Sequence, residues 1–294
     1  MPEPSSFELV DTHVHLWDLS HSWYPDIQKI EVQEGHEVGL GDMAGLRRDY
    51  LVEHYLEDSA CATVRKVVHV SAVTEPRAYL HEAGWLDGLA ARTGIPAAVI
   101  GSVEPADEPA RMAGDIDAQA ASPLLRGVRV MFGLDPESAG ARRLVALLAE
   151  RGLVFEIVAH PDDAAAYARL VEPHPELTCV LEHALWPQRS DTEGFRQWRQ
   201  ALGVLASIDH LHCKISGLAM ALHSFDPDRL RPWVEGCIDA FGIERCVVGS
   251  NFPVDRLYGS FQALMDSYLT ITAGLGESDA RRLYVSNAEA LYRV

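Results

Sequence analysis

The chain alternates between short apolar runs and longer stretches with helical periodicity. The apolar runs are rich in Val, Ile and Leu and are apolar on both faces, which is typical of buried parallel strands. Eight such runs occur, at Phe7–Val14, Val64–Ala72, Ala97–Val103, Leu125–Phe132, Leu153–Ala159, Thr178–His183, Leu211–Gly217 and Cys246–Phe252.

Amphipathic segments separate these runs and predict helices, with Gly152, Gly242 and Gly274 standing where helices are expected to end. The alternation predicts an α/β protein: a closed (β/α)8 barrel of the TIM type, in one domain over residues 1–294. A doubly wound open sheet is the alternative, but no Gly-rich turn follows the first run. The segments are Glu82–Thr93, Pro136–Arg151, Asp162–Glu172, Glu193–Ser207, Pro227–Phe241 and Ser260–Gly274.

A long irregular stretch, residues 18–49, follows the first run directly. In a barrel such a loop emerges at the catalytic face, so we interpret it as a lid. The alternative is a surface excursion packed on the barrel rim.

Histidines stand at the ends of two predicted strands. His13 and His15 are two residues apart, so a strand directs both imidazoles to one side. Such a pair suits a zinc-like ion or a polarised carbonyl oxygen. His183 ends the sixth run, and the carboxyl ends of barrel strands face the active site. The leading hypothesis is a divalent metal ion, with zinc favoured, held by His13, His15 and His183.

The eighth run closes with a glycine, a carboxamide and a proline. Gly249 permits close backbone approach and Pro253 stops the strand. Asn251 is then the polar group presented at the barrel mouth.

Taken together, these motifs resemble those of the amidohydrolase superfamily, over nearly the whole chain from Val10 to Arg293. The resemblance narrows to the branch with sugar-lactone, muconolactone-type and 2-pyrone-4,6-dicarboxylate hydrolases. It implies a hydrolase in which an activated water attacks a lactone carbonyl. The runs that narrow it are His13–Asp18, Gly127–Arg129, Cys213–Gly217, Phe241–Cys246 and Asn287-Ala288.

The resemblance also implies a strand-eight carboxylate as general base, and here the chain departs from it. Asn251 cannot accept a proton near neutral pH and would be a weaker metal ligand than a carboxylate. Asp255 and His183 are the replacement bases that we consider equally, with Asp11 on the same face as His13 but deeper in the barrel. Strand alternation directs Glu182 away from the centre.

Three residues are candidates for binding substrate. Arg129 can clamp a carboxylate through two parallel hydrogen bonds, and the alternative is a pairing with a neighbouring acid. Lys214 lies inside an apolar run, so it must face the barrel mouth or be paired. Trp17 stands just beyond the first run and is a candidate for the pocket wall.

Composition restricts the partners. The net charge of −18 argues against nucleic acid and anionic membranes, although an anionic substrate stays compatible through a local arginine. The cysteines are scattered without a C-x-x-C pair, which argues against a disulfide framework or a structural zinc site. The segment Met1–Phe7 lacks the pattern of a signal peptide. No apolar run approaches the ~20 residues of a membrane span. We expect a cytoplasmic protein that acts on a small molecule, a cyclic ester that bears a carboxylate or hydroxyls. A homo-oligomer is compatible with the sequence.

Three other functions stay open from the sequence. The first is lactone hydrolysis without metal, with the histidines donating hydrogen bonds to the carbonyl oxygen. The second is non-oxidative decarboxylation, which the wider superfamily includes. The third is a binding protein whose chemistry was lost with the strand-eight carboxylate.

Overall fold

Eight parallel strands form one sheet whose order follows the chain from β1 to β8. The structure, a computed structural model, describes residues 7–28, 41–105 and 108–294. Each strand pairs in parallel with the next one along the chain. The strands are β1 (Glu8–Val14), β2 (Thr63–Val70), β3 (Ala98–Ser102), β4 (Leu125–Arg129), β5 (Val154–Ile157), β6 (Cys179–Leu181), β7 (Leu211–Ile215) and β8 (Cys246–Val248).

The sheet closes on itself where β1 meets the segment after β8. Val14 forms a parallel bridge with Phe252. The backbone N–H of Asn251 donates to the carbonyl of His13 over 2.8 Å, and that of His15 donates to the carbonyl of Phe252 over 2.9 Å. The predicted (β/α)8 barrel is therefore confirmed, and its closure joins two of the predicted site segments.

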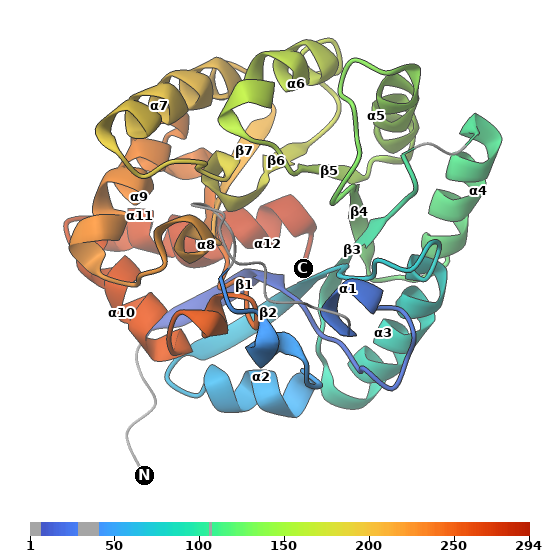
Figure 1. Cartoon of the computed structure of the whole chain (residues 1–294), viewed down its shortest axis with the longest axis horizontal. Helices are drawn as coiled ribbons and strands as arrows, with labels where there is room; N and C mark the ends of the chain where they lie inside the picture. The colour runs from blue at the N-terminus through green and yellow to red at the C-terminus, as the bar shows by residue number, and fades with distance from the viewer. Residues whose placement is uncertain (1–6, 29–40, 106–107) are drawn as a thin grey trace.

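Helices surround the barrel (Figure 1), and α12, near the chain's end, contacts β1 and β8. Side chains of Ser138, Asp191 and Ser260 cap the starts of α5, α7 and α10. The helices are α1 (Pro25–Gln28), α2 (Val52–Asp58), α3 (Tyr79–Thr93), α4 (Pro109–Gln119), α5 (Ala139–Arg151), α6 (Ala164–Val171), α7 (Thr192–Ala206), α8 (Leu218–Leu222), α9 (Pro227–Phe241), α10 (Phe261–Ile271), α11 (Glu277–Arg281) and α12 (Asn287–Tyr292).

Two of the three predicted helix stops lie at helix ends. Gly152 ends α5 in the left-handed conformation at φ 60°, and Gly242 follows α9. Gly274 does not end a helix, because α10 already stops at Ile271 and Thr272 follows it.

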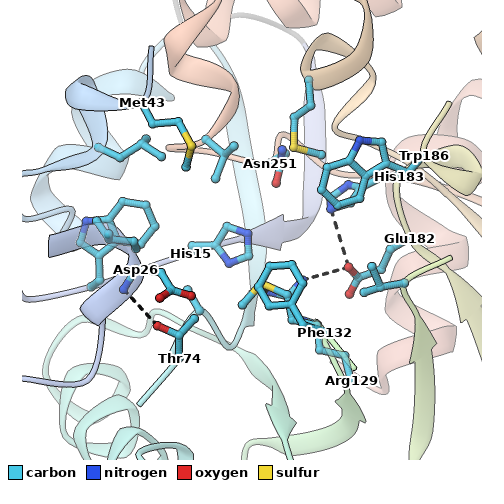
Figure 2. Close-up of a pocket in the computed structure, with 18 residues that line it drawn as sticks. His15, Asp26, Met43, Thr74, Arg129, Phe132, Glu182, His183, Trp186 and Asn251 are labelled. Atoms are coloured by element: carbon cyan, nitrogen blue, oxygen red, sulfur yellow. Dashed lines mark hydrogen bonds and ion pairs between the residues drawn. The ribbon is translucent and has the colours of Figure 1, made fainter. Parts of the chain in front are cut away.

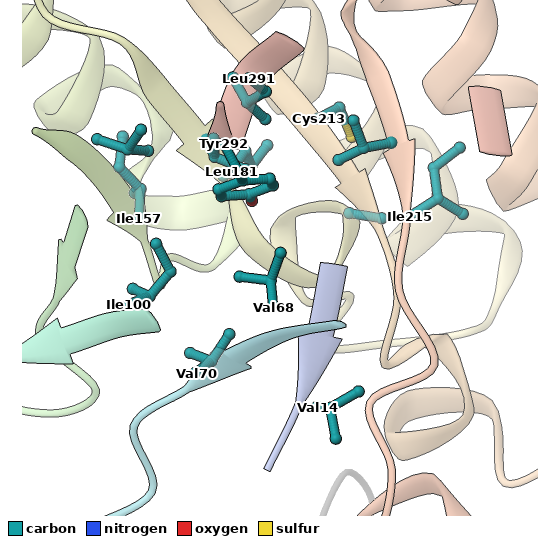
Figure 3. Packing of buried hydrophobic residues seen from close by; sticks show 14 of the residues in the cluster. Val14, Val68, Val70, Ile100, Ile157, Leu181, Cys213, Ile215, Leu291 and Tyr292 are labelled. Atoms are coloured by element: carbon teal, nitrogen blue, oxygen red, sulfur yellow. The ribbon is translucent and has the colours of Figure 1, made fainter. Parts of the chain in front are cut away.

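The core lies within the strands and between the strands and helices. Aliphatic side chains such as Val68, Val70 and Ile100 are buried there, together with Tyr292 of α12 (Figure 3). Close packing of this kind fixes the strands, and with them the side chains at the strand ends.

Strands β6 and β8 end before their apolar runs do, and this shapes the site. β6 ends at Leu181, and the four residues from His183 to Trp186 have positive φ. β8 ends at Val248, and Asn251 has φ 60°. His183 and Asn251 therefore lie on turns beyond the strands, where strand alternation no longer decides their direction.

The loop predicted at residues 18–49 lies partly outside the described residues, at 29–40. Its described parts include α1 and a 3₁₀ turn at Ala44–Leu46. The interpretation as a lid stays a prediction. Among the described residues, every helix is too short or too polar to cross a membrane.

Candidate active site

His13 and His15 face each other at the end of β1. Their Nε2 atoms lie 3.2 Å apart. Nδ1 of His15 lies 2.7 Å from the carbonyl oxygen of Val70, which can only accept, so this nitrogen carries the proton. Nε2 of neutral His15 therefore keeps its lone pair.

A β-bulge produces this arrangement. The register of β1 against β2 shifts between Asp11 and Val14. The carboxylate of Asp11 consequently accepts hydrogen bonds from the backbone N–H of Ser250 over 2.8 Å and from the hydroxyl of Tyr55 in α2 over 3.0 Å. The expectation that Asp11 shares the inner face with His13 is wrong. The bonds of the Asp11 carboxylate join β1 to the segment after β8 and to α2.

His183 meets His13 across the barrel mouth, with their ring centroids 4.5 Å apart. Its Nδ1 lies 3.0 Å from Oγ of Ser216, just beyond β7. Its Nε2 lies 3.7 Å from Oε2 of Glu182. The three predicted histidines thus converge at one place, as the sequence indicated.

Glu182 points inward, contrary to the expectation from strand alternation. A 3₁₀ turn begins at Glu182, because β6 has ended at Leu181. Its Oε2 accepts a hydrogen bond from Arg129 over 2.9 Å, and its Oε1 is buried without a partner. No residue pattern in the sequence predicted this turn.

Ligand atoms of His13, Glu182 and His183 lie within 4.8 Å of one another, in a group that could hold a metal ion. His15, predicted as a third ligand, is not in this group, and Glu182 stands in its place. The sequence alone does not tell whether His15 or Glu182 joins His13 and His183 in such a group.

The two predicted substrate-binding cations are both paired with acids. Arg129 donates from Nε and Nη2 to the carbonyl of Ser71 over 3.1 and 2.5 Å, besides its bond to Glu182. Lys214 is fully buried and donates to both oxygens of Glu156 over 2.7 and 2.5 Å. Nζ of Lys214 also lies 3.4 Å from Nδ1 of His13. Arg129 lines the pocket described below, whereas Lys214 lies beneath it.

Asn251 lies against Asp255, the predicted base. Its Nδ2 donates to Oδ1 of Asp255 over 2.8 Å. Asn251 reaches the pocket wall, and Asp255 does not. Burial raises the pKa of Asp255 to about 8, because its charged form has lost water and gained only one hydrogen bond.

Burial also keeps the histidines neutral. It lowers the pKa of His13 well below its ordinary value, with Lys214 adding to the effect. It lowers the pKa of His15 similarly, helped by Arg129. It lowers the pKa of His183 to about 4, although Glu182 opposes the shift. Their nitrogen lone pairs are therefore available at neutral pH.

A pocket of about 150 Å³ opens above these groups. Figure 2 shows His15, His183 and Asn251 directed into it. Trp17 lines it as predicted, and Asp26, which sequence reasoning missed, enters the wall from α1. The other lining residues are Ile27, Met43, Leu46, Ala72, Thr74, Arg129, Met131, Phe132, Val158, Glu182, Trp186, Met220 and Val254.

Comparisons with known proteins agree with this fold. The model of the family described as "Amidohydrolase" matches residues 10–294. An uncharacterized protein, y4mH, of Sinorhizobium fredii is 30% identical over 305 residues, covering 99% of this chain and 100% of that protein. An L-fucono-1,5-lactonase of Burkholderia ambifaria is 29% identical over 265 residues, covering 86% and 82%. The crystal structure of an amidohydrolase from Burkholderia multivorans with bound zinc has a TM-score of 0.81 at 23% identity, covering 97% and 99%.

Proposed function

Because the chain belongs to the amidohydrolase family, we propose that this hydrolase opens a lactone or a related cyclic ester. The L-fucono-1,5-lactonases among its relatives support a lactone as substrate. The observation that carries the proposal is the convergence of His13, His15, His183 and Asn251 at the mouth of the barrel.

In our proposal, His15 takes the proton from the attacking water. Its Nδ1–H bond to Val70 puts the acceptor lone pair on Nε2, as a general base requires, and Nε2 of His13 at 3.2 Å is the partner that the water would replace. Asn251 orients the water, since its Nδ2 is bound to Asp255 and its oxygen remains as an acceptor. Asp255 is a poorer base, because it lies behind Asn251 and its raised pKa keeps it protonated at neutral pH.

The donor set of His13, Glu182 and His183 fits a divalent ion. Two imidazoles and a carboxylate are the ligands that zinc accepts, and the unpartnered Oε1 of Glu182 is an acceptor that a cation would satisfy. An ion at this place would supply Lewis-acid polarisation of the ester carbonyl. The zinc bound in the Burkholderia multivorans amidohydrolase supports zinc as the ion.

Ser216 and Gly217 position His183, one of the three residues that would hold this ion. Oγ of Ser216 bonds Nδ1 of His183, so that Nε2 is directed to the pocket side. Gly217 leaves room for the imidazole, since a Cβ at this position would overlap it.

Proton release on ring opening tests the proposal. We expect lactones to release one acid equivalent per turnover in a weakly buffered assay, and His183→Ala to abolish this while circular dichroism shows a folded barrel. Carbon dioxide among the products would instead identify a decarboxylase. A folded protein that turns over no lactone of any type would contradict the proposal.

A further inference from the structure

The pocket walls are apolar around a small polar floor. Methionines, aromatic rings and aliphatic side chains make up most of the lining, whereas the polar atoms belong mainly to the candidate catalytic groups. Phe132 stands at the opening with 65% of its surface exposed. Figure 2 shows Met43 above the pocket, and Phe132 and Trp186 along its side. A bound molecule therefore meets hydrocarbon and sulfur over most of its surface.

The wall also lacks an unpaired cation among the described residues. Arg129 is the cationic side chain of the described wall, and Glu182 and the Ser71 carbonyl bind its guanidinium. Lys214, the next cation beneath, is neutralised by Glu156. A carboxylated substrate would have to displace one of these buried pairs.

Asp26 sets the polarity of the side opposite Glu182. Its backbone N–H binds Oγ1 of Thr74 over 3.3 Å, which anchors α1 to the segment after β2. Its carboxylate is directed toward the middle of the pocket (Figure 2). A carboxylate there repels anions, and it can only accept hydrogen bonds.

We propose that the substrate is an uncharged lactone whose ring bears an alkyl or aryl group. This inference rests on the proposed lactone hydrolysis and names its substrate class. Ring hydroxyl groups that face Met43 and Met220 would lose water without gaining partners, which costs binding free energy, and only those on the side of Asp26 and Thr74 would find acceptors. An apolar substituent loses nothing and buries its surface in the same place.

Matched lactones of one ring size test the proposal. The probes are a δ-lactone bearing a phenyl group, the unsubstituted δ-lactone, a polyhydroxylated δ-lactone and a carboxylated δ-lactone. We expect kcat/KM for the phenyl compound to exceed that of the polyhydroxylated and carboxylated compounds by at least about tenfold, the size of effect that one apolar contact produces in a pocket.

A variant at the pocket opening tests whether the preference for the phenyl lactone arises from contact with Phe132. Phe132→Ala should lower kcat/KM for the phenyl lactone several-fold more than for the unsubstituted lactone, since only the phenyl group reaches the pocket opening. Leu56→Ala, on α2, is the matched control, because Leu56 is also an exposed apolar residue, at 50%, and does not line the pocket. Equal losses for both lactones in Phe132→Ala would contradict the proposal.

Calorimetric binding of the corresponding lactams separates this inference from the proposed function. Preference for the phenyl lactam without turnover of any lactone would retain the ligand class and reject lactone hydrolysis. Turnover that favours the polyhydroxylated or carboxylated lactone would retain lactone hydrolysis and overturn the inference.

Discussion

The carboxamide of Asn251 donates a hydrogen bond to the carboxylate of Asp255, with 2.8 Å between Nδ2 and Oδ1. Both side chains are buried, and Oδ2 of Asp255 has no partner. A carboxylate in this position is costly to ionise, and burial raises its pKa to about 8. The pair thus presents an oriented amide to the pocket and keeps an acid behind it.

Asp255→Asn should change the pH dependence of stability. An aspartate in the unfolded chain has a pKa of about 3.9, so between about pH 4 and pH 8 the folded protein binds more protons than the unfolded one. This stability is present below the unfolded pKa and is lost as the pH rises through the folded pKa. The variant lacks this decline and should gain on the wild type from pH 5 to pH 8.5 in urea denaturation. A difference that is the same at both pH values would refute the raised pKa.

His15→Gln should lower kcat by roughly 10²–10⁴, the usual contribution of a general base, with a smaller change in KM. Asp255→Asn, measured beside it, should leave kcat nearly unchanged. His210→Gln is the control, because His210 also bonds a backbone carbonyl, that of Val171, and precedes β7 at the other end of the strand. A large loss in Asp255→Asn with full activity in His15→Gln would return the base to Asp255.

Gly217→Ala should disable the site through His183. Gly217 has φ 60°, and an added Cβ would overlap the imidazole of His183. Gly152→Ala provides the same φ of 60° with nothing within 4 Å of the added Cβ. Both variants carry backbone strain, so both should lose stability in urea denaturation, but kcat should fall only in Gly217→Ala. Similar kcat values in the two variants would show that His183 is not held there.

Much of the fold was predictable because parallel strands buried on both faces require continuous apolar runs in the sequence. The convergence of His13, His15 and His183 followed from placing each at a strand's carboxyl end. What the sequence could not reveal lies where local geometry departs from regular strands. The bulge after Asp11 turned its carboxylate outward, and the left-handed residues from His183 to Trp186 broke the strand alternation from which the direction of Glu182 had been inferred.

Pairing was equally hidden in the sequence. Arg129 and Lys214 stood as candidates for substrate binding, and their acids lie on other strands, at Glu182 and Glu156. Strand alternation determines the face on which a side chain lies, but the register between strands determines its partner. Several short helices, such as α2 and α8, were also missed, because so few turns give too little periodicity to recognise.

Zinc supplied during purification should bind in about one equivalent and leave on dialysis against a chelator. If Nε2 of His13 held the ion, Nδ1 would have to carry the proton and would face the Lys214 ammonium at 3.4 Å, so we expect weak retention. Elemental analysis of His13→Gln, which should bind none, provides the control. Full activity in metal-free protein would exclude a catalytic role for the ion.

The ion pair between Lys214 and Glu156 should be a major determinant of stability. Both side chains are fully buried, and the hydroxyl of Tyr292 also donates to Glu156 over 2.6 Å. Lys214→Met leaves the carboxylate buried without its cation, which should lower the free energy of unfolding by roughly 3–5 kcal/mol. Glu156→Gln in the same chain removes the unpaired charge, so the double variant should regain much of that loss in urea denaturation.

The surface pair of Arg169 and Glu137, both more than half exposed, serves as the comparison, and breaking it should cost at most about 1 kcal/mol. Additive losses at the two buried positions would show that they do not interact, and the neutralisation of Lys214 beneath the pocket would then have no energetic basis.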